Sequence, residues 1–192
     1  MKWCTHIQIA RGIASVLGLD PGEEEMLIRG SIDPDRIPDL MEGERVSHHG
    51  APRDFMMHLL WESRRDILCN RGPEGIYKLG RALHYIQDGM VPSRDRPHRR
   101  MEDRMTDLRP PIGAIESGAG RSRPSLTLIR RSIGKVRPYS RPDKSLDRAA
   151  FHSAVVAAAV LWPPHRPPGM GWSPAVPVFI GLILVLGLHT AG

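Results

Sequence analysis

Apolar residues in the first 108 positions recur at helical spacing, and no run there shows the sustained alternation of a strand. Helices are expected over residues 3–18, 23–32, 52–69, 73–88 and 97–108, with Gly- and Pro-containing turns between them. Several helices of this length can pack around one shared core. The sequence therefore predicts an all-α fold, a helical bundle, for residues 1–108.

The chain changes character after Leu108. Residues 109–143 are rich in Arg, Pro and Gly, and we interpret them as a long loop or linker. Residues 144–162 return to a helical pattern rich in Ala and Val, with Ser145 as the expected N-cap. These segments divide the chain into a helical region, a linker and a further helix.

Residues 163–192 begin with a Pro-rich break and contain no Asp, Glu, Lys or Arg from Pro167 onward. A helix that spans a bilayer needs about 20 residues, and residues 172–191 supply that length. This segment is a candidate C-terminal membrane anchor, and a buried core helix is the alternative. By the positive-inside rule, an anchored chain would keep its Arg-rich segment and helical region in the cytoplasm, and a chain without an anchor is also expected to be cytoplasmic.

Positive charge is concentrated in residues 94–148, which hold 15 Lys or Arg against 7 Asp or Glu in a chain of formal net charge +6. A basic block suits an anionic partner, either lipid headgroups or nucleic acid. A solvated Arg-rich linker is the alternative interpretation. The two cysteines, Cys4 and Cys69, are too few for a disulfide framework or a Cys-rich zinc site.

Two histidine–carboxylate pairs are the main chemical signal. His84 and Asp88 lie four residues apart, as do His98 and Glu102, so each pair shares one face of its expected helix. Further candidate ligands stand upstream, namely His6, Asp33, Asp35, His48 and His49. Imidazole and carboxylate ligands without thiolates suit zinc in a catalytic site, although a single pair at this spacing is commonly a surface contact.

The order of these motifs resembles the zinc-dependent phospholipase C family. TH, GSIDPD, SHH, LGRALHYIQD and HRRME follow one another within residues 3–108, and the most specific piece is LG, ALHY and Asp88 with Pro92 beyond it. That family is all-α and is similar in fold and metal site to the single-strand-specific fungal zinc nucleases. The resemblance implies a helical bundle with a pocket for two to three zinc ions.

Carried over residue by residue, the resemblance implies a metal ligand set of His6, Asp35, His48, His84, Asp88, His98 and Glu102. Asp88 would bridge two zinc ions, with His84 and His48 completing one ion and His6 contributing to its neighbour. His98 and Glu102 would hold a third ion. Asp35 would be the catalytic residue that orients or deprotonates the attacking water. His49 and Asp33 remain alternatives to His48 and Asp35.

The sequence departs from the family pattern at three points. The family ligates zinc through a mature N-terminal Trp, but Trp3 lies only three residues before His6, so this ligand is not carried over. Arg94 stands where the family usually places a histidine, and an arginine remains protonated and cannot replace imidazole. The segment between the last ligand regions is also shorter than in the family.

These features predict a zinc-dependent phosphodiester hydrolase acting on phospholipids at a membrane surface. One alternative is a nuclease-like zinc hydrolase on single-stranded nucleic acid, for which base-stacking aromatic residues are expected. Residues 94–148 offer only Tyr139 for that purpose. The other alternative is a degenerate, non-catalytic metal-binding membrane protein.

Overall fold

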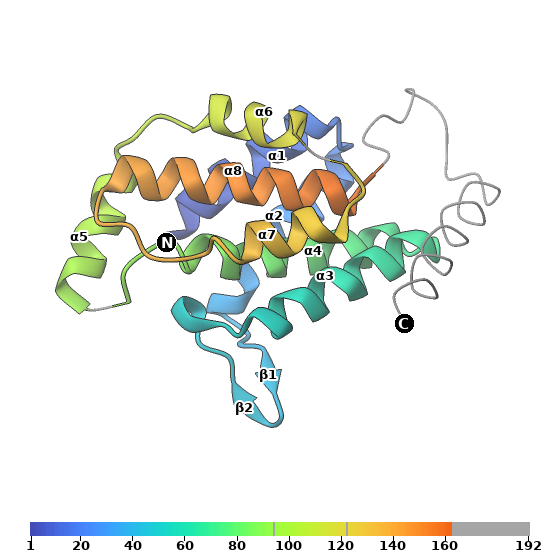
Figure 1. Ribbon diagram of the computed structural model, residues 1–192, viewed down its shortest axis with the longest axis horizontal. Coiled ribbons are helices and arrows are strands. Elements are labelled where there is room, and N and C mark those ends of the chain that lie inside the picture. The colour runs from blue at the N-terminus through green and yellow to red at the C-terminus, as the bar shows by residue number, and fades with distance from the viewer. Residues whose placement is uncertain (94, 122, 163–192) are drawn as a thin grey trace.

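The computed structural model describes residues 1–93, 95–121 and 123–162 (Figure 1). The α-helices in these ranges are α1 Trp3–Leu17, α2 Pro21–Ile32, α3 Arg53–Leu68, α4 Gly72–Asp88, α5 Asp95–Thr106, α6 Ile112–Gly120, α7 Leu126–Ile133 and α8 Pro142–Val160. Short 3-10 turns lie at η1 Asp33–Asp35 and η2 His48–Gly50, and strands β1 Leu40–Met41 and β2 Glu44–Arg45 form a small antiparallel hairpin. The all-α class is confirmed for the described residues.

Helix α4 runs through the centre of the bundle. Every residue from Leu79 to Asp88 is buried, and the helix packs against α2, α3 and α8. A helix buried on all sides is a core element, so polar groups on it need partners inside the protein. This stretch carries His84 and Asp88, one of the two histidine–carboxylate pairs.

Two glycines let α2 and α4 approach closely. A Cβ atom on Gly30 would lie 2.1 Å from the carbonyl oxygen of Tyr77, and one on Gly80 would lie 2.4 Å from that of Leu27. Any larger residue at either position would push the helices apart. The close approach brings the backbone carbonyl of Ser31 within 3.0 Å of His84 Nδ1.

The start of α2 follows its sequence signal. Asp20 accepts a hydrogen bond from the Glu23 backbone N–H at 2.8 Å, and the Glu23 carboxylate accepts one from the Asp20 N–H at 3.1 Å. This capping box, with Pro21 in the first helical position, fixes where the helix begins. At its other end, α2 leads directly into η1, which carries Asp35.

The hairpin of residues 36–45 connects η1 to η2 and was not expected from the sequence. Its two-residue turn places Glu42 and Gly43 at φ 53° and 85°, the positive values that such tight hairpins need. Helix α4 holds the base, because Arg81 binds the Asp39 carboxylate and Tyr85 donates to it at 2.7 Å. The hairpin is therefore joined rigidly to the helix that carries His84 and Asp88.

The interpretation of residues 109–143 as a long loop is corrected by α6 and α7, which both pack against α8. Each helix is short and buries few residues, chiefly Ile115 in α6 and Ile133 in α7. Helices of 9 and 8 residues within a segment rich in Arg, Gly and Pro are too short for periodicity to be recognised over a window of about 11 or more residues. The segment is part of the packed bundle.

Helix α8 begins at Pro142, so the expected N-cap role of Ser145 is wrong. Ser145 is buried inside the first turns, where its hydroxyl donates to the Met90 carbonyl at 3.0 Å. The predicted membrane anchor at 172–191 and the departure at Arg94 both lie outside the described residues. Among the described helices, none combines the length and apolar character needed to cross a membrane.

Candidate metal centre

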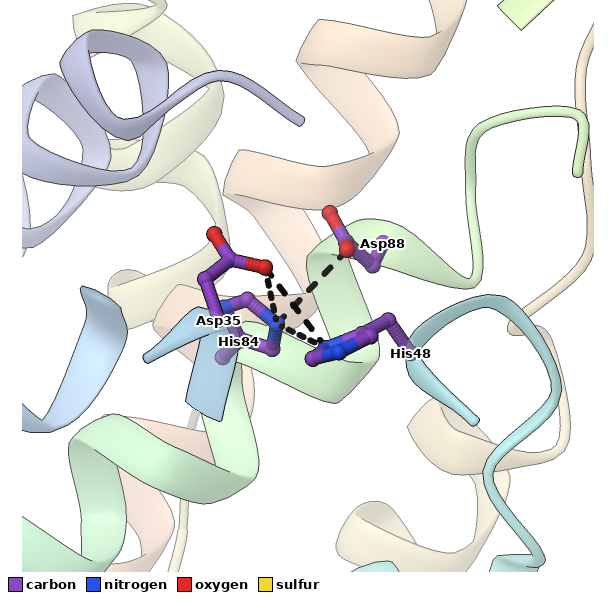
Figure 2. A group of neighbouring side chains, drawn as sticks. All are labelled: Asp35, His48, His84 and Asp88. Carbon is purple, nitrogen blue, oxygen red and sulfur yellow. Dashed lines mark hydrogen bonds and ion pairs between the residues drawn. The ribbon is translucent and has the colours of Figure 1, made fainter. Parts of the chain in front are cut away.

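Four predicted ligands from three separate elements converge on one point. Asp35 comes from η1, His48 from η2, and His84 and Asp88 from the end of α4. One ligand atom from each lies within 4.8 Å of the corresponding atoms of the other three. Figure 2 shows the four side chains pointing toward one another.

The separations are those of groups able to share one ion. His48 Nδ1 lies 2.9 Å from His84 Nε2, and each of these nitrogens lies 3.7 Å from Asp35 Oδ1. Asp88 Oδ2 lies 3.6 Å from His84 Nε2. Ligands around a tetrahedral zinc are separated by about 3.4 Å, as bonds of about 2.1 Å require. Small side-chain movements would therefore bring all four onto one ion.

The histidine rings are oriented as metal ligands usually are. Nδ1 donates a hydrogen bond to an oxygen acceptor in His6 (Gln87 Oε1, 2.6 Å), His49 (Asp88 O, 3.0 Å), His84 (Ser31 O, 3.0 Å) and His98 (Pro92 O, 2.9 Å). A ring that donates from Nδ1 keeps the lone pair on Nε2, which fixes both its tautomer and its direction. These four rings therefore keep an Nε2 lone pair that could bind a cation, and in His84 it accepts a hydrogen bond from His48 Nδ1 at 2.9 Å.

Burial favours the neutral form of His84 and leaves Asp88 charged. Burial, helped by the neighbouring His6 ring, lowers the pKa of His84 to about 3. Burial alone would raise the pKa of the Asp88 carboxyl, but the Met1 ammonium and the His6 and His84 rings outweigh it and hold that pKa well below its ordinary value. Near neutral pH, His84 is an imidazole and Asp88 a carboxylate, the states that bind metals.

A second group adjoins the first on its buried side. His6 Nε2 lies 3.2 Å from Asp88 Oδ1, is fully buried and makes no hydrogen bond. The α-amino group of Met1 contacts Asp88 and lies 3.1 Å from Glu102 Oε1. Burial lowers the pKa of this amine, but the carboxylates of Asp88 and Glu102 together raise it by more, so the net shift is upward. From the sequence, the family's N-terminal ligand was not carried over, because Trp3 lies only three residues before His6.

The choice between the adjacent histidines becomes clear in the structure. His48 faces Asp35 and His84, whereas His49 turns to the other side and meets His98 edge-on with ring centroids 4.4 Å apart. His98 Nε2 in turn lies 3.1 Å from Glu102 Oε1. The two neighbours thus belong to different groups, and the sequence alternatives were not exclusive.

The choice between the aspartates is equally clear. Asp33 is buried away from the cluster, where it accepts a hydrogen bond from the Tyr77 hydroxyl at 3.0 Å and pairs with Arg29 at 3.4 Å. Asp35 Oδ2 instead accepts a hydrogen bond from the Trp3 indole at 2.8 Å, which leaves Oδ1 toward the histidines. Sequence reasoning gave Trp3 no such role.

A further supporting residue behind the site was also missed. Gln87 accepts from His6 through Oε1 and donates through Nε2 to Ser153 Oγ at 3.2 Å, and all three side chains are fully buried. These two bonds fix the direction of the Gln87 amide. Its position next to Asp88 offered a hint, but Ser153 is too distant in sequence to signal the contact.

Comparison of the chain with protein-family models, curated proteins and solved structures gives no match. The functional interpretation therefore depends on the chemistry of the site and on the motif resemblance. The donor set of neutral imidazoles and carboxylates fits a zinc-type cation.

Proposed function

We propose that this chain is a zinc-dependent phosphodiester hydrolase, similar to the zinc-dependent phospholipases C, that acts on phospholipids. The observation that carries the proposal is the cluster of Asp35, His48, His84 and Asp88, with ligand atoms within 4.8 Å of one another. The buried His84 is neutral and the buried Asp88 beside it is charged, which are the protonation states in which these side chains bind zinc.

Two further groups would complete a site for two to three ions. His6 and Asp88 would contribute to an ion beside the first, because His6 Nε2 is buried without a hydrogen-bond partner and faces the Asp88 carboxylate. His98 and Glu102 would hold another, with the His49 ring close enough to take part. Asp88 would be shared by the two groups, because Oδ1 faces His6 and Oδ2 faces His84.

The chemistry needs a phosphodiester, an attacking water and a group that controls the water. Bound zinc would lower the pKa of a coordinated water and neutralise charge on the phosphoryl oxygens. Asp35 would orient that water or accept its proton through Oδ1, since the Trp3 indole holds Oδ2; His48, His84 and Asp88 would then hold the ion, and its fourth position would be open to the water. The side chain of Asp35 is 25% exposed, so solvent and substrate can reach it.

Metal content separates the enzyme from the alternatives. We expect the purified full chain to contain two or three zinc ions by inductively coupled plasma mass spectrometry. His84→Ala should remove at least one of them. His58→Ala is the matched control, because His58 is exposed on α3. A chain without zinc at neutral pH would refute the proposal.

Substrate assays then choose between the chemical classes. We expect hydrolysis of bis(p-nitrophenyl) phosphate and of phosphatidylcholine vesicles, with both activities lost on chelation. Preferential cleavage of single-stranded DNA would favour the nuclease-like alternative. Zinc without hydrolysis of any of the three would identify a non-catalytic metal-binding protein.

A further inference from the structure

The hairpin of residues 36–45 lies between the two turns that carry Asp35 and His48. It begins directly after Asp35 in η1 and returns shortly before His48 in η2. Figure 1 shows it projecting from the helical body at the bottom of the view, below α3. Any surface that contacts the hairpin would therefore be held next to the candidate metal centre.

The hairpin exposes apolar side chains to solvent. Leu40 is 62% exposed, Ile37 60% and Met41 38%. Within the described part of the chain, the other exposed large apolar residues are Trp3, Trp61, Ile112 and Leu126. Trp3 also lies at the centre, because its indole binds Asp35. Exposed apolar residues scattered singly are ordinary, but three within residues 37–41 of one hairpin indicate a binding surface.

The hairpin is rigid at its base. The Arg81 guanidinium donates to the Asp39 carboxylate and to the Ile37 carbonyl, the latter at 3.0 Å, and Val46 donates its N–H to the Asp39 carbonyl at 2.9 Å. Val46 itself is buried. Because these contacts fix the base on α4, the apolar side chains cannot fold back onto the protein without breaking them.

Charge indicates which surface the hairpin fits. It holds two arginines, Arg36 and Arg45, against three acids, Asp39, Glu42 and Glu44; Arg36 is paired with Asp33 and Asp39 with Arg81. An element without excess positive charge gains nothing from a phosphate backbone, whose binding requires several cations. Exposed apolar side chains without a cluster of cations suit the boundary between headgroups and acyl chains of a zwitterionic bilayer.

We propose that this hairpin is the membrane-contacting element of the protein, with Ile37, Leu40 and Met41 entering the interface of a zwitterionic phospholipid surface. The inference rests on the proposed function for its biological sense, since it would present lipid headgroups to Asp35 and the metal centre. The hairpin would bind lipid whether or not residues 172–191 form an anchor.

The test measures where the hairpin lies when the full chain meets vesicles. A spin label is attached at Leu40→Cys in a chain with Cys4→Ser and Cys69→Ser, since both native cysteines are exposed. A second label at Trp61→Cys is the matched control, because Trp61 is 51% exposed on α3. With phosphatidylcholine vesicles, accessibility to oxygen should rise at position 40 and accessibility to a polar nickel complex should fall. Position 61 should stay as in water.

A second measurement links the hairpin to lipid hydrolysis. In Leu40→Ser/Met41→Ser, hydrolysis of phosphatidylcholine vesicles should fall about tenfold, whereas hydrolysis of soluble bis(p-nitrophenyl) phosphate and the zinc content should not change. A label at position 40 that stays in water, or that responds to single-stranded DNA instead, would overturn the inference. If the unmodified chain hydrolyses none of these substrates, the proposed function fails. The label at position 40 would still show whether the hairpin enters the membrane.

Discussion

Two pairs of residues with the same spacing have different surroundings in this protein. His84 and Asp88 lie one turn apart on α4, with side chains 0% and 3% exposed, and receive His48 and Asp35 from other elements. His98 and Glu102 lie one turn apart on α5, with side chains 20% and 14% exposed, and meet the His49 ring and the Met1 amine. One pair is enclosed, and the other lies at the edge.

The difference shows that helical spacing brings together only two candidate ligands. The others come from segments that the fold places beside the helix, and α4 meets more of these segments because it lies at the centre of the bundle. A buried pair must be paired or hydrogen-bonded, whereas water can serve an edge pair. We therefore expect the α4 pair to control metal binding, and the α5 pair to modulate it.

The largest effect is expected at Asp88. Asp88→Asn removes the charge shared by the two groups, so we expect zinc to fall to one ion per chain or fewer and hydrolysis of bis(p-nitrophenyl) phosphate to fall about 10³-fold or more. Asp103→Asn is the control, since Asp103 is 63% exposed and contacts Lys2. Circular dichroism checks folding. Unchanged zinc content in a folded Asp88→Asn chain would show that the α4 pair does not control metal binding.

A smaller effect is expected at the edge pair. His98→Ala should remove one zinc ion and lower hydrolysis of the same substrate about 10- to 100-fold, because the enclosed cluster keeps all four ligands. His49→Ala should remove the same ion if its ring takes part beside His98. Zinc content after dialysis, measured for both variants, tests this. Loss of every ion in His98→Ala would show that the two pairs form one inseparable site.

Much of the fold was predictable because helix formation is local. The boundaries expected for α1, α3 and α4 agree with the structure within about two residues, as periodicity and Gly or Pro punctuation allow. The i,i+4 pair of α4 was predictable for the same reason. The helices α6 and α7 were not, since their formation depends on packing against α8, a segment distant in sequence.

The membership of the centre was only partly predictable. Adjacent residues such as His48 and His49 have the same local signal, and the turn at η2 decides which way each one points. The same holds for Asp33 and Asp35 on either side of Pro34 in η1. Supporting contacts such as Trp3 with Asp35 join residues far apart in the chain, so tertiary packing alone reveals them.

Support behind the site distinguishes the groups further, and Gln87 tests it. Gln87→Met keeps the volume but removes the acceptor for His6 Nδ1–H, so zinc affinity of the full chain should weaken about tenfold in competition with a chelator. Gln87→Glu retains an acceptor and should restore binding. Nitrogen-15 shifts of the His6 ring should show loss of the fixed tautomer only in Gln87→Met. Equal tautomers in both variants would make Gln87 a packing residue.

The smallest effect concerns a histidine that is buried without any carboxylate one turn away. His152 on α8 lies beside Phe151, and neither of its ring nitrogens has a hydrogen-bond partner. Burial, with the nearby charges of Arg148 and Lys135, lowers the pKa of His152 to about 4. Among the described residues, His152 has no acceptor for its Nδ1 and no carboxylate facing its ring. We therefore expect it to make the fold sensitive to acid and not to bind metal.

The sign follows from proton uptake. Between the unfolded pKa of about 6.5 and the folded pKa of about 4, the unfolded chain binds more protons at this residue, so stability falls as pH falls through that window. From pH 7 to pH 5 the contribution approaches about 2 kcal/mol. His152→Leu should lose less stability over this range by that amount, measured by urea unfolding with a chelator present, and should keep its zinc without the chelator. The exposed His58→Leu should follow the unmodified chain, and a pH dependence unchanged by His152→Leu would place the acid sensitivity elsewhere.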